Sequence, residues 1–236
     1  MEESVDVFKR MAGEKAVDYI EDGMLVGLGS GSTVYWMLKK LGELVEQGLN
    51  VNGISSSSLT ESWAREFKIP LTDFSDVQLL DLAIDGADEI DPSFHLIKGG
   101  GGSLVREKVV NAHSKKLIIV ADQSKRVDVL GKFPLPVEVL QFGWQMTANK
   151  IVELGAKPVL REENGSVYVS DNGNYILDCA FESIPDPENL HNKLKQLIGV
   201  IETGLFFDMV DMVIMGGPEG TVVINKQIYK DLKTSK

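Results

Sequence analysis

Hydrophobic residues recur at helical spacing in some stretches of the first half of the chain and form short runs in others. The helical spacing predicts helices over residues 5–21, 32–47, 59–68 and 103–114. The short apolar runs predict strands over residues 24–29, 51–54, 79–84, 94–97 and 117–121. Because strands that alternate with helices form parallel sheets, we predict an α/β fold with a doubly wound, mostly parallel, Rossmann-like sheet.

The pattern changes at Gly131–Pro136, where two prolines mark a stiff crossing. Beyond it, short strands alternate with two helices, and Asn164-Gly165 and Asn172-Gly173 lie where hairpin turns are expected. This pattern predicts a smaller α+β domain with an antiparallel, ferredoxin-like sheet. Because the apolar segment 207–224 is expected to return to the first sheet, two domains are predicted: residues 1–131 plus 205–236, and residues 132–204.

Composition excludes several classes of partner. The 236 residues include 43% hydrophobic ones, enough for a sizeable core, and carry a net charge of −11. Such an acidic chain is a poor match for nucleic acid or an anionic membrane surface. Cys179 is the only cysteine, which excludes an intramolecular disulfide and fits a reducing cytoplasm. The acidic start Met1–Ser4 lacks the layout of a signal peptide, and no apolar stretch approaches the ~20 residues of a membrane span.

The segment Gly27–Thr33 leads from a predicted strand into a predicted helix, a place that favours phosphate because free N–H groups and the positive helix end point outward. The dinucleotide fingerprint requires glycine where Ser32 stands, and a Walker loop requires Gly-Lys-Ser/Thr, so neither fits. The hydroxyls of Ser30, Ser32 and Thr33 suit a terminal phosphate monoester. The alternative is a capped turn in which Ser32 is the N-cap.

Three other predicted strands also end in unusual segments. Ser55–Ser58 is either an N-cap cluster or a ligand-facing loop. Asp85 and Asp88 supply carboxylates that can move protons, and Lys98 can hold a phosphate or an oxyanion. The glycines Gly99–Gly102 allow the backbone to approach a ligand closely. Because ligands bind beyond the carboxyl ends of parallel strands, we expect these segments to converge at one edge of the sheet.

The predicted helix 103–114 carries apolar residues, including Val109, on one side, and places Glu107 with Asn111 on the polar side. Periodicity alone therefore predicts that Glu107 is a solvated carboxylate.

The other candidate residues have simpler interpretations. The three histidines lack the spacing of a metal site, and His95 is interpreted as structural. Cys179 lies in a strand-like run and is interpreted as a core residue. Lys125, just past a strand end, is either a surface lysine or an anion clamp.

Several segments occur together and in order along nearly the whole chain. They are Gly27–Thr33, the serine run, Asp85–Ile90, Lys98–Gly102, Arg106–Lys108, Ala121–Lys125, Gly131–Val139, Asp171–Asn174 and Gly204–Phe206. In combination they resemble the ribose-5-phosphate isomerase A family. The resemblance implies interconversion of D-ribose 5-phosphate and D-ribulose 5-phosphate in the pentose phosphate pathway, without a metal or organic cofactor, by a homodimer or homotetramer.

The resemblance also implies roles for individual residues. Glu107 occupies the position of the proton-transfer base, with Asp85, Asp88 and Lys98 around the reacting end of the sugar. The resemblance therefore favours a cleft-facing Glu107 over the solvated carboxylate that periodicity predicts. The implied substrate-binding residues are Lys9, Ser30, Gly31, Ser32, Thr33, Gly86, Ala87, Gly99, Gly100, Gly101 and Lys125.

Three further functions fit the same pattern less well. An amino-sugar-phosphate deaminase of related fold would release ammonia. A sugar-phosphate-binding regulatory module would need a basic DNA-binding segment, which the acidic N-terminus does not supply. Transfer of an acyl group from coenzyme A, with a glutamate nucleophile, is a third option on fold grounds.

Overall fold

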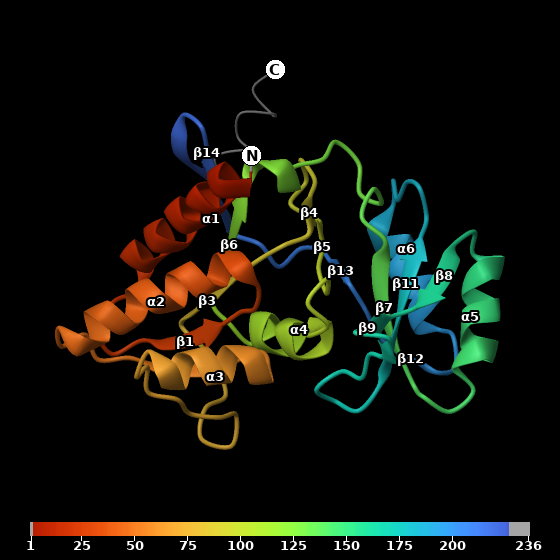
Figure 1. Ribbon diagram of the computed structural model, residues 1–236, viewed down its shortest axis with the longest axis horizontal. Coiled ribbons are helices and arrows are strands. Elements are labelled where there is room, and N and C mark those ends of the chain that lie inside the picture. Colours follow the sequence, from red (N-terminus) through yellow and green to blue (C-terminus); the bar gives the residue numbers. More distant parts are fainter. Residues whose placement is uncertain (1, 227–236) are drawn as a thin grey trace. The chain divides into compact units, whose positions relative to one another are not determined.

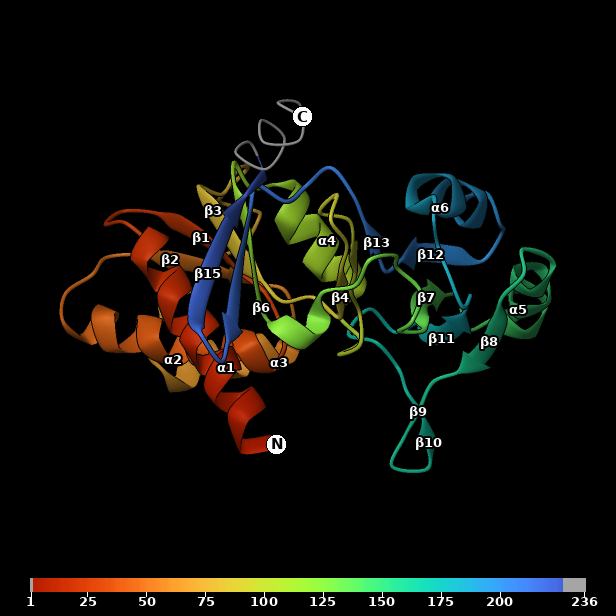
Figure 2. The ribbon, with the colours of Figure 1, turned by 90° about the horizontal axis from the view of Figure 1, so that it is seen from above.

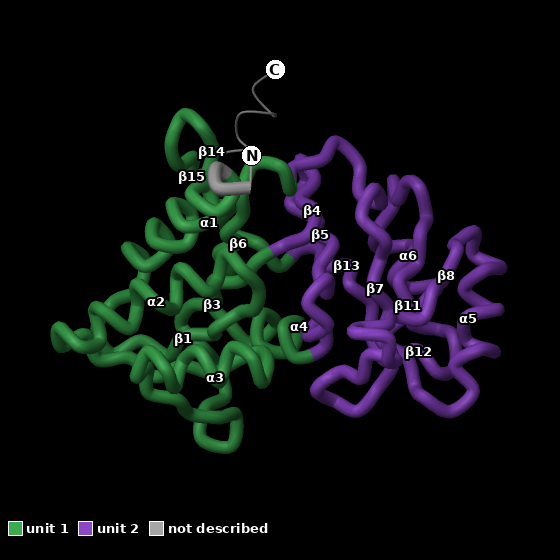
Figure 3. The backbone as a smooth tube through the Cα atoms, in the orientation of Figure 1, with its two compact units in different colours: residues 1–86, 106–125, 209–236 green, residues 87–105, 126–208 purple. Residues whose placement is uncertain are grey.

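The computed structural model describes residues 2–226 and divides into two compact units (Figure 3). Of the described residues, unit 1 contains 2–86, 106–125 and 209–226, and unit 2 contains 87–105 and 126–208. The division predicted from the sequence differs, since it groups residues 87–105, 126–131 and 205–208 with the first domain. The predicted pair of domains, residues 1–131 plus 205–236 and residues 132–204, remains a prediction about which parts of the chain fold independently.

Unit 1 is built on a six-stranded sheet of order β15-β14-β6-β3-β1-β2, in which β15 alone is antiparallel to its neighbour. Strands β14, β6, β3 and β1 of this sheet are labelled in Figure 1. Its strands are β1 (Leu25–Leu28), β2 (Asn52–Ser55), β3 (Leu82–Asp85), β6 (Leu117–Asp122), β14 (Met212–Gly217) and β15 (Gly220–Asn225). Its helices are α1 (Glu2–Ala16), η1 (Val17–Tyr19), α2 (Ser32–Glu46), α3 (Ser58–Glu66), η2 (Gln123–Lys125) and most of α4 (Leu104–Ala112). The predicted mostly parallel, doubly wound sheet is confirmed.

Both faces of the central strands β1, β3, β6 and β14 are covered. The face toward α1, α2 and α3 carries alternate apolar residues of four strands, namely Val26, Leu28, Leu82, Ile84, Ile118, Val120, Met212 and Ile214. On the opposite face, Val110 of α4 packs so closely over Gly27 that a Cβ at Gly27 would lie 2.6 Å from it. Full burial of both faces explains why these strands appear as apolar runs rather than alternating ones.

Unit 2 contains a four-stranded antiparallel sheet of order β12-β7-β11-β8. The strands are β7 (Leu135–Val139), β8 (Lys157–Leu160), β11 (Tyr175–Ala180) and β12 (Val200–Thr203), with helices α5 (Trp144–Glu153) and α6 (Pro187–Lys195). Leu135, Val137, Val139, Leu177 and Cys179 share one face of the sheet and one apolar core with α5 and α6. Glu138 and Asp178 lie on the opposite face, and the predicted smaller α+β domain is confirmed.

Turn chemistry accounts for one predicted hairpin and not for the other. Asn164 and Gly165 both have positive φ and join β9 (Glu162–Glu163) to β10 (Ser166–Val167), a hairpin that projects from the end of β8 (Figure 2). Asn172-Gly173 makes a turn closed by the Ser170 N–H, which donates to the Asn174 carbonyl. However, β11 pairs with β7 and β8 rather than with the segment before this turn, so a strand hairpin there is wrong.

The predicted strand over residues 94–97 does not belong to the parallel sheet. Its observed part, β5 (Leu96–Ile97), is the middle strand of a three-stranded antiparallel sheet with β4 (Glu89–Ile90) and β13 (Leu205–Phe206) in unit 2. The expected convergence of four strand ends therefore holds in the six-stranded sheet only for those of β1, β2 and β3. The sequence pattern around β5 would be the same if β5 belonged to the parallel sheet. Its place in the antiparallel sheet depends on β13, which is distant in sequence.

Candidate active site

Strands β1 and β3 are neighbours whose connections leave in opposite directions, the switch point at which doubly wound sheets bind ligands. A buried carboxylate joins their carboxyl ends. Asp85, at the end of β3 and 0% exposed, accepts the Ser30 N–H at 3.0 Å and the Gly86 N–H at 2.8 Å through one oxygen. Its other oxygen accepts the side-chain amide of Asn111 at 2.8 Å. The Asp85 carboxylate therefore holds the loop after β1 in place.

The hydroxyl of Ser30 faces the end of β2. It lies 2.9 Å from the Ser56 hydroxyl, donates to the Ser57 hydroxyl at 2.9 Å and lies 3.2 Å from the Thr60 hydroxyl. Ser57 is the N-cap of α3, since its hydroxyl accepts the Thr60 N–H, and Thr60 in turn donates to the Gly29 carbonyl. The N-cap interpretation of the serine run is confirmed at Ser57, and this cluster ties the β1 loop to α3.

The first turn of α2 follows this loop. Gly31 is its N-cap, with φ of 103° and no side-chain cap, and Ser32 is the first helical residue. Ser32 as N-cap is therefore wrong. Ser32 is exposed, Thr33 is 9% exposed, and no acidic residue lies in the first turn. This helix end offers N–H groups and hydroxyls to an anion.

Helix α4 buries the residues that its sequence pattern assigned to solvent. Glu107 is 4% exposed and Asn111 is 3% exposed, whereas Val109 is 44% exposed. The solvated interpretation of Glu107 is therefore wrong. One helical turn separates Glu107 from Asn111, and Asn111 bonds to Asp85, so α4 brings a second buried carboxylate to this end of β3.

Asp88, Lys98 and the glycines form a second group of candidates, within unit 2. The N–H of Gly100 donates to the Asp88 carboxylate at 2.7 Å. The backbone of Lys98 donates to Gly204, and its ammonium lies 5.5 Å from the centre of the Phe206 ring. Lys98 is 2% exposed, a rare situation for a lysine and a typical one for a functional ammonium.

Lys9 and Lys125 approach the carboxyl end of β14 from different elements. Gly216 packs against the backbone of Phe8 in α1, and a Cβ at Gly217 would lie 2.8 Å from the amide of Gln123 in η2. Lys9 follows Phe8 in α1, and its Nζ lies 3.5 Å from Oδ1 of Asp6. Lys125 is the last residue of η2. The structure thus brings both lysines near the β14 end, at the same edge as Ser30 and Asp85.

His95 is confirmed as a structural residue and Cys179 as a core residue. His95 bonds to Asp91 at 3.0 Å. Cys179 is 0% exposed, and burial raises the pKa of its thiol. Within residues 2–226, no three His, Cys, Asp or Glu side chains are arranged to hold a metal ion.

Sequence reasoning gave Asn111 and Arg161 no role in holding the candidates in place. The sequence pattern places Asn111 on the polar side of its helix, one turn from Glu107, and this spacing is the signal that could have identified it. Among the described helices, none is long and apolar enough to cross a membrane.

Comparisons with known proteins agree with one another. A family model described as ribose 5-phosphate isomerase A (phosphoriboisomerase A) matches residues 52–220. Ribose-5-phosphate isomerase A 1 of Oceanobacillus iheyensis is 56% identical over 89% of this chain and 95% of its own length. The Bacillus mycoides ribose-5-phosphate isomerase A is 47% identical over 90% and 96% of the two chains.

Solved structures give the same result. A D-ribose-5-phosphate isomerase in complex with phospho-erythronic acid superposes with a TM-score of 0.91 at 37% identity, covering 94% of this chain and 99% of that one. Ribose 5-phosphate isomerase from Plasmodium falciparum gives a TM-score of 0.90 at 36% identity, covering 93% and 98% of the two chains.

Proposed function

The chain belongs to the ribose-5-phosphate isomerase A family, and we propose that it interconverts D-ribose 5-phosphate and D-ribulose 5-phosphate in the non-oxidative pentose phosphate pathway. The observation that carries the proposal is the burial of Glu107, at 4% exposure, on a helix whose apolar Val109 is left exposed. Removing a carboxylate from water lowers the stability of the fold. A buried carboxylate at the ligand-binding edge of the sheet therefore indicates a functional role.

The reaction needs a single positioned base. In the open-chain aldose, the Glu107 carboxylate takes the proton from C2, and the electron pair of that C–H bond forms the C1=C2 bond of an enediolate. Return of a proton to C1, with transfer of a hydroxyl proton from O2 to O1, gives the ketose. As the C1=C2 bond forms, the π electron pair of the C1 carbonyl moves to O1, and Lys98 stabilises the negative charge that develops there.

The two aspartates receive different roles. Both oxygens of Asp85 are engaged by donors of the fold, whereas Asp88 accepts a backbone N–H through one oxygen. We assign ring opening and hydroxyl proton transfer to Asp88, and the positioning of the β1 loop to Asp85.

The first turn of α2 is the proposed phosphate site, with Gly31, Ser32 and Thr33 donating to the phosphate and Lys9 and Lys125 as substrate contacts. Gly86, Ala87 and Gly99–Gly101 contribute backbone groups around the sugar. The solved relative that holds phospho-erythronic acid supports a phosphorylated ligand.

Replacing Ser32 and Thr33 together by alanine is expected to raise the KM for ribose 5-phosphate by at least about 10–100-fold, because even one lost hydrogen bond to a charged group is worth roughly 1.5–3 kcal/mol. Turnover of unphosphorylated ribose should change little. Substrate titrations with both sugars measure the difference. Equal losses for the two sugars would place the phosphate elsewhere.

We also propose a homo-oligomer, a dimer or tetramer, in the cytoplasm. Phe142 is 95% exposed and Ile198 is 96% exposed, and the hydroxyl of Thr147 ties Ile198 to α5, where Met146 is 67% exposed. Clustered exposed apolar side chains of this size mark protein contacts. Sedimentation velocity measures the assembly, and a monomer at micromolar concentration would contradict the proposal.

The direct test of the activity is a spectroscopic assay of ketose formation from ribose 5-phosphate after dialysis against a chelator. We expect full conversion to equilibrium without added metal. Chelator-sensitive activity that a divalent ion restores would contradict cofactor-free catalysis. Ammonia release from an amino-sugar phosphate, without isomerisation, would favour the deaminase alternative.

A further inference from the structure

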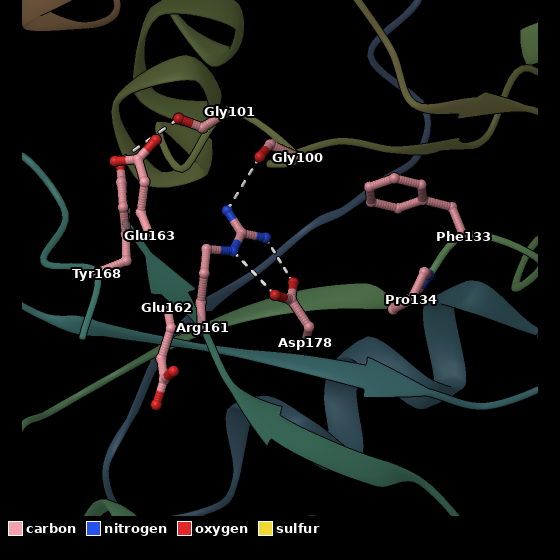
Figure 4. Close-up of a pocket in the computed structure, with 9 residues that line it drawn as sticks. All are labelled: Gly100, Gly101, Phe133, Pro134, Arg161, Glu162, Glu163, Tyr168 and Asp178. Atoms are coloured by element: carbon pink, nitrogen blue, oxygen red, sulfur yellow. Dashed lines mark hydrogen bonds and ion pairs between the residues drawn. The ribbon is translucent and has the colours of Figure 1, made fainter. Parts of the chain in front are cut away.

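Arg161 follows β8 on the face of the small sheet that lies opposite α5 and α6, and its side chain is 12% exposed. The guanidinium forms a two-pronged pair with Asp178, through Nε at 2.9 Å and through Nη2 (Figure 4). Its remaining nitrogen, Nη1, donates to the Gly99 carbonyl at 2.9 Å and to the Gly100 carbonyl at 3.1 Å. The Arg161 side chain thus joins the small sheet to the loop Gly99–Gly102, called the glycine loop below.

The glycine loop is a tight structure in which Asp88 takes part. The Gly102 N–H donates to Gly99, and the Gly100 N–H donates to Asp88 at 2.7 Å. A Cβ at Gly100 would lie 2.6 Å from the Asp88 carboxylate, and one at Gly99 would lie 3.2 Å from Pro136. The loop therefore has little freedom to place Asp88 differently.

Peptide geometry links Arg161 to Asp88. The carbonyl of Gly99 and the N–H of Gly100 belong to one planar trans peptide unit, so they point in opposite directions. Arg161 holds the carbonyl end of this unit, and Asp88 accepts from the N–H end. Fixing the carbonyl therefore fixes the direction of the N–H that orients the carboxylate.

A pair that served stability alone would need only Arg161 and Asp178. The Nη1 atom of Arg161 donates in addition to two loop carbonyls. The planar guanidinium allows this while Nε and Nη2 hold Asp178, and a lysine ammonium does not reproduce this geometry. The pocket beside the pair is lined by Gly100, Gly101, Phe133, Arg161, Tyr168 and Asp178 (Figure 4). The hydroxyl of Tyr168 also reaches the Gly101 carbonyl, at 3.4 Å, so a second side chain holds the same loop.

We propose that Arg161, oriented by Asp178, is a positioning residue for the isomerisation that acts through the Gly99–Gly100 peptide on the carboxylate of Asp88. The proposal rests on the proposed function, in which Asp88 moves hydroxyl protons.

The test compares Arg161→Lys and Asp178→Asn with the wild-type enzyme. We expect kcat to fall about 10–100-fold, the value of a charge-assisted hydrogen bond, while KM changes less than about threefold because the phosphate is held on other elements. The matched control is Arg65→Lys, which alters an exposed pair with Glu61 and should leave both constants unchanged.

A double variant separates positioning from stability. In an Asp88→Asn background, Arg161→Lys should lower the residual kcat less than about twofold, because the carboxylate that it orients is gone. Equal losses in the two backgrounds, or an unchanged kcat in both Arg161→Lys and Asp178→Asn, would overturn the proposal.

Hydrogen exchange of backbone amides measures the mobility of the glycine loop independently of activity. In Arg161→Lys and in Asp178→Asn, peptides that cover residues 98–102 should exchange faster than in the wild type, while peptides of β6 keep their protection. Unchanged exchange of residues 98–102 in both variants would refute the positioning role. A wild-type protein without isomerase activity would instead refute the proposed function and leave this measurement interpretable.

Discussion

Glu107→Gln is expected to lower kcat by about 10²–10⁴, the usual contribution of a positioned acid–base group. The substitution keeps the shape of the side chain and removes the oxygen that accepts the C2 proton. KM should stay within a few-fold of the wild-type value, because the proposed phosphate contacts lie on α2 and not on α4. Steady-state kinetics with ribose 5-phosphate measure both constants.

Glu61→Gln is the matched control, since Glu61 is an exposed helical glutamate paired with Arg65. Its kcat should remain that of the wild type. A folded Glu107→Gln protein with near wild-type turnover would show that Glu107 is not the base and would move that role to Asp85 or Asp88. In heavy water, label at C1 or C2 of the sugar would support proton carriage, although internal transfer that outruns exchange leaves no label.

The architecture could be predicted because it depends on local patterns. Buried parallel strands require continuous apolar runs, and those of β1, β3 and β6 alternate with helices along unit 1. The hairpin at Asn164-Gly165 could be predicted for the same reason, since two adjacent residues with positive φ specify the turn. Strand β5 could not be assigned to its sheet, because its partner β13 is distant in sequence.

The site could be predicted only in part from residue patterns. The glycine, serine and aspartate segments stand at strand ends, where topology alone makes them candidates. Glu107 required the family resemblance, because amphipathic periodicity assumes that buried residues are apolar, and this assumption fails where a fold buries a carboxylate for chemistry. Arg161 carried no signal in sequence, since its role depends on a contact with Gly99.

Asp85→Ala is expected to lower the free energy of unfolding by about 3–5 kcal/mol, whereas Asp85→Asn should cost only about 1–2 kcal/mol. Alanine leaves the N–H groups of Ser30 and Gly86 and the amide of Asn111 without their acceptor. Asparagine keeps one oxygen for the two backbone donors. The NH₂ group of the new asparagine would face the side chain of Asn111. The Oδ1 atom of Asn111 is buried without a hydrogen-bond partner within residues 2–226, and it would accept from this NH₂ group if the Asn111 amide rotated by 180°.

Urea denaturation of the two variants measures the difference, with the exposed Asp76→Ala as a control that should stay within about 0.5 kcal/mol of the wild type. The same pair decides the role of Asp85 in the reaction. As a positioning group, Asp85 should tolerate asparagine with a kcat within about tenfold of the wild type, because the loop after β1 keeps its hydrogen bonds. A stable Asp85→Asn protein whose kcat falls as far as that of Glu107→Gln would assign proton transfer to Asp85, since a neutral amide preserves the loop but cannot accept the proton.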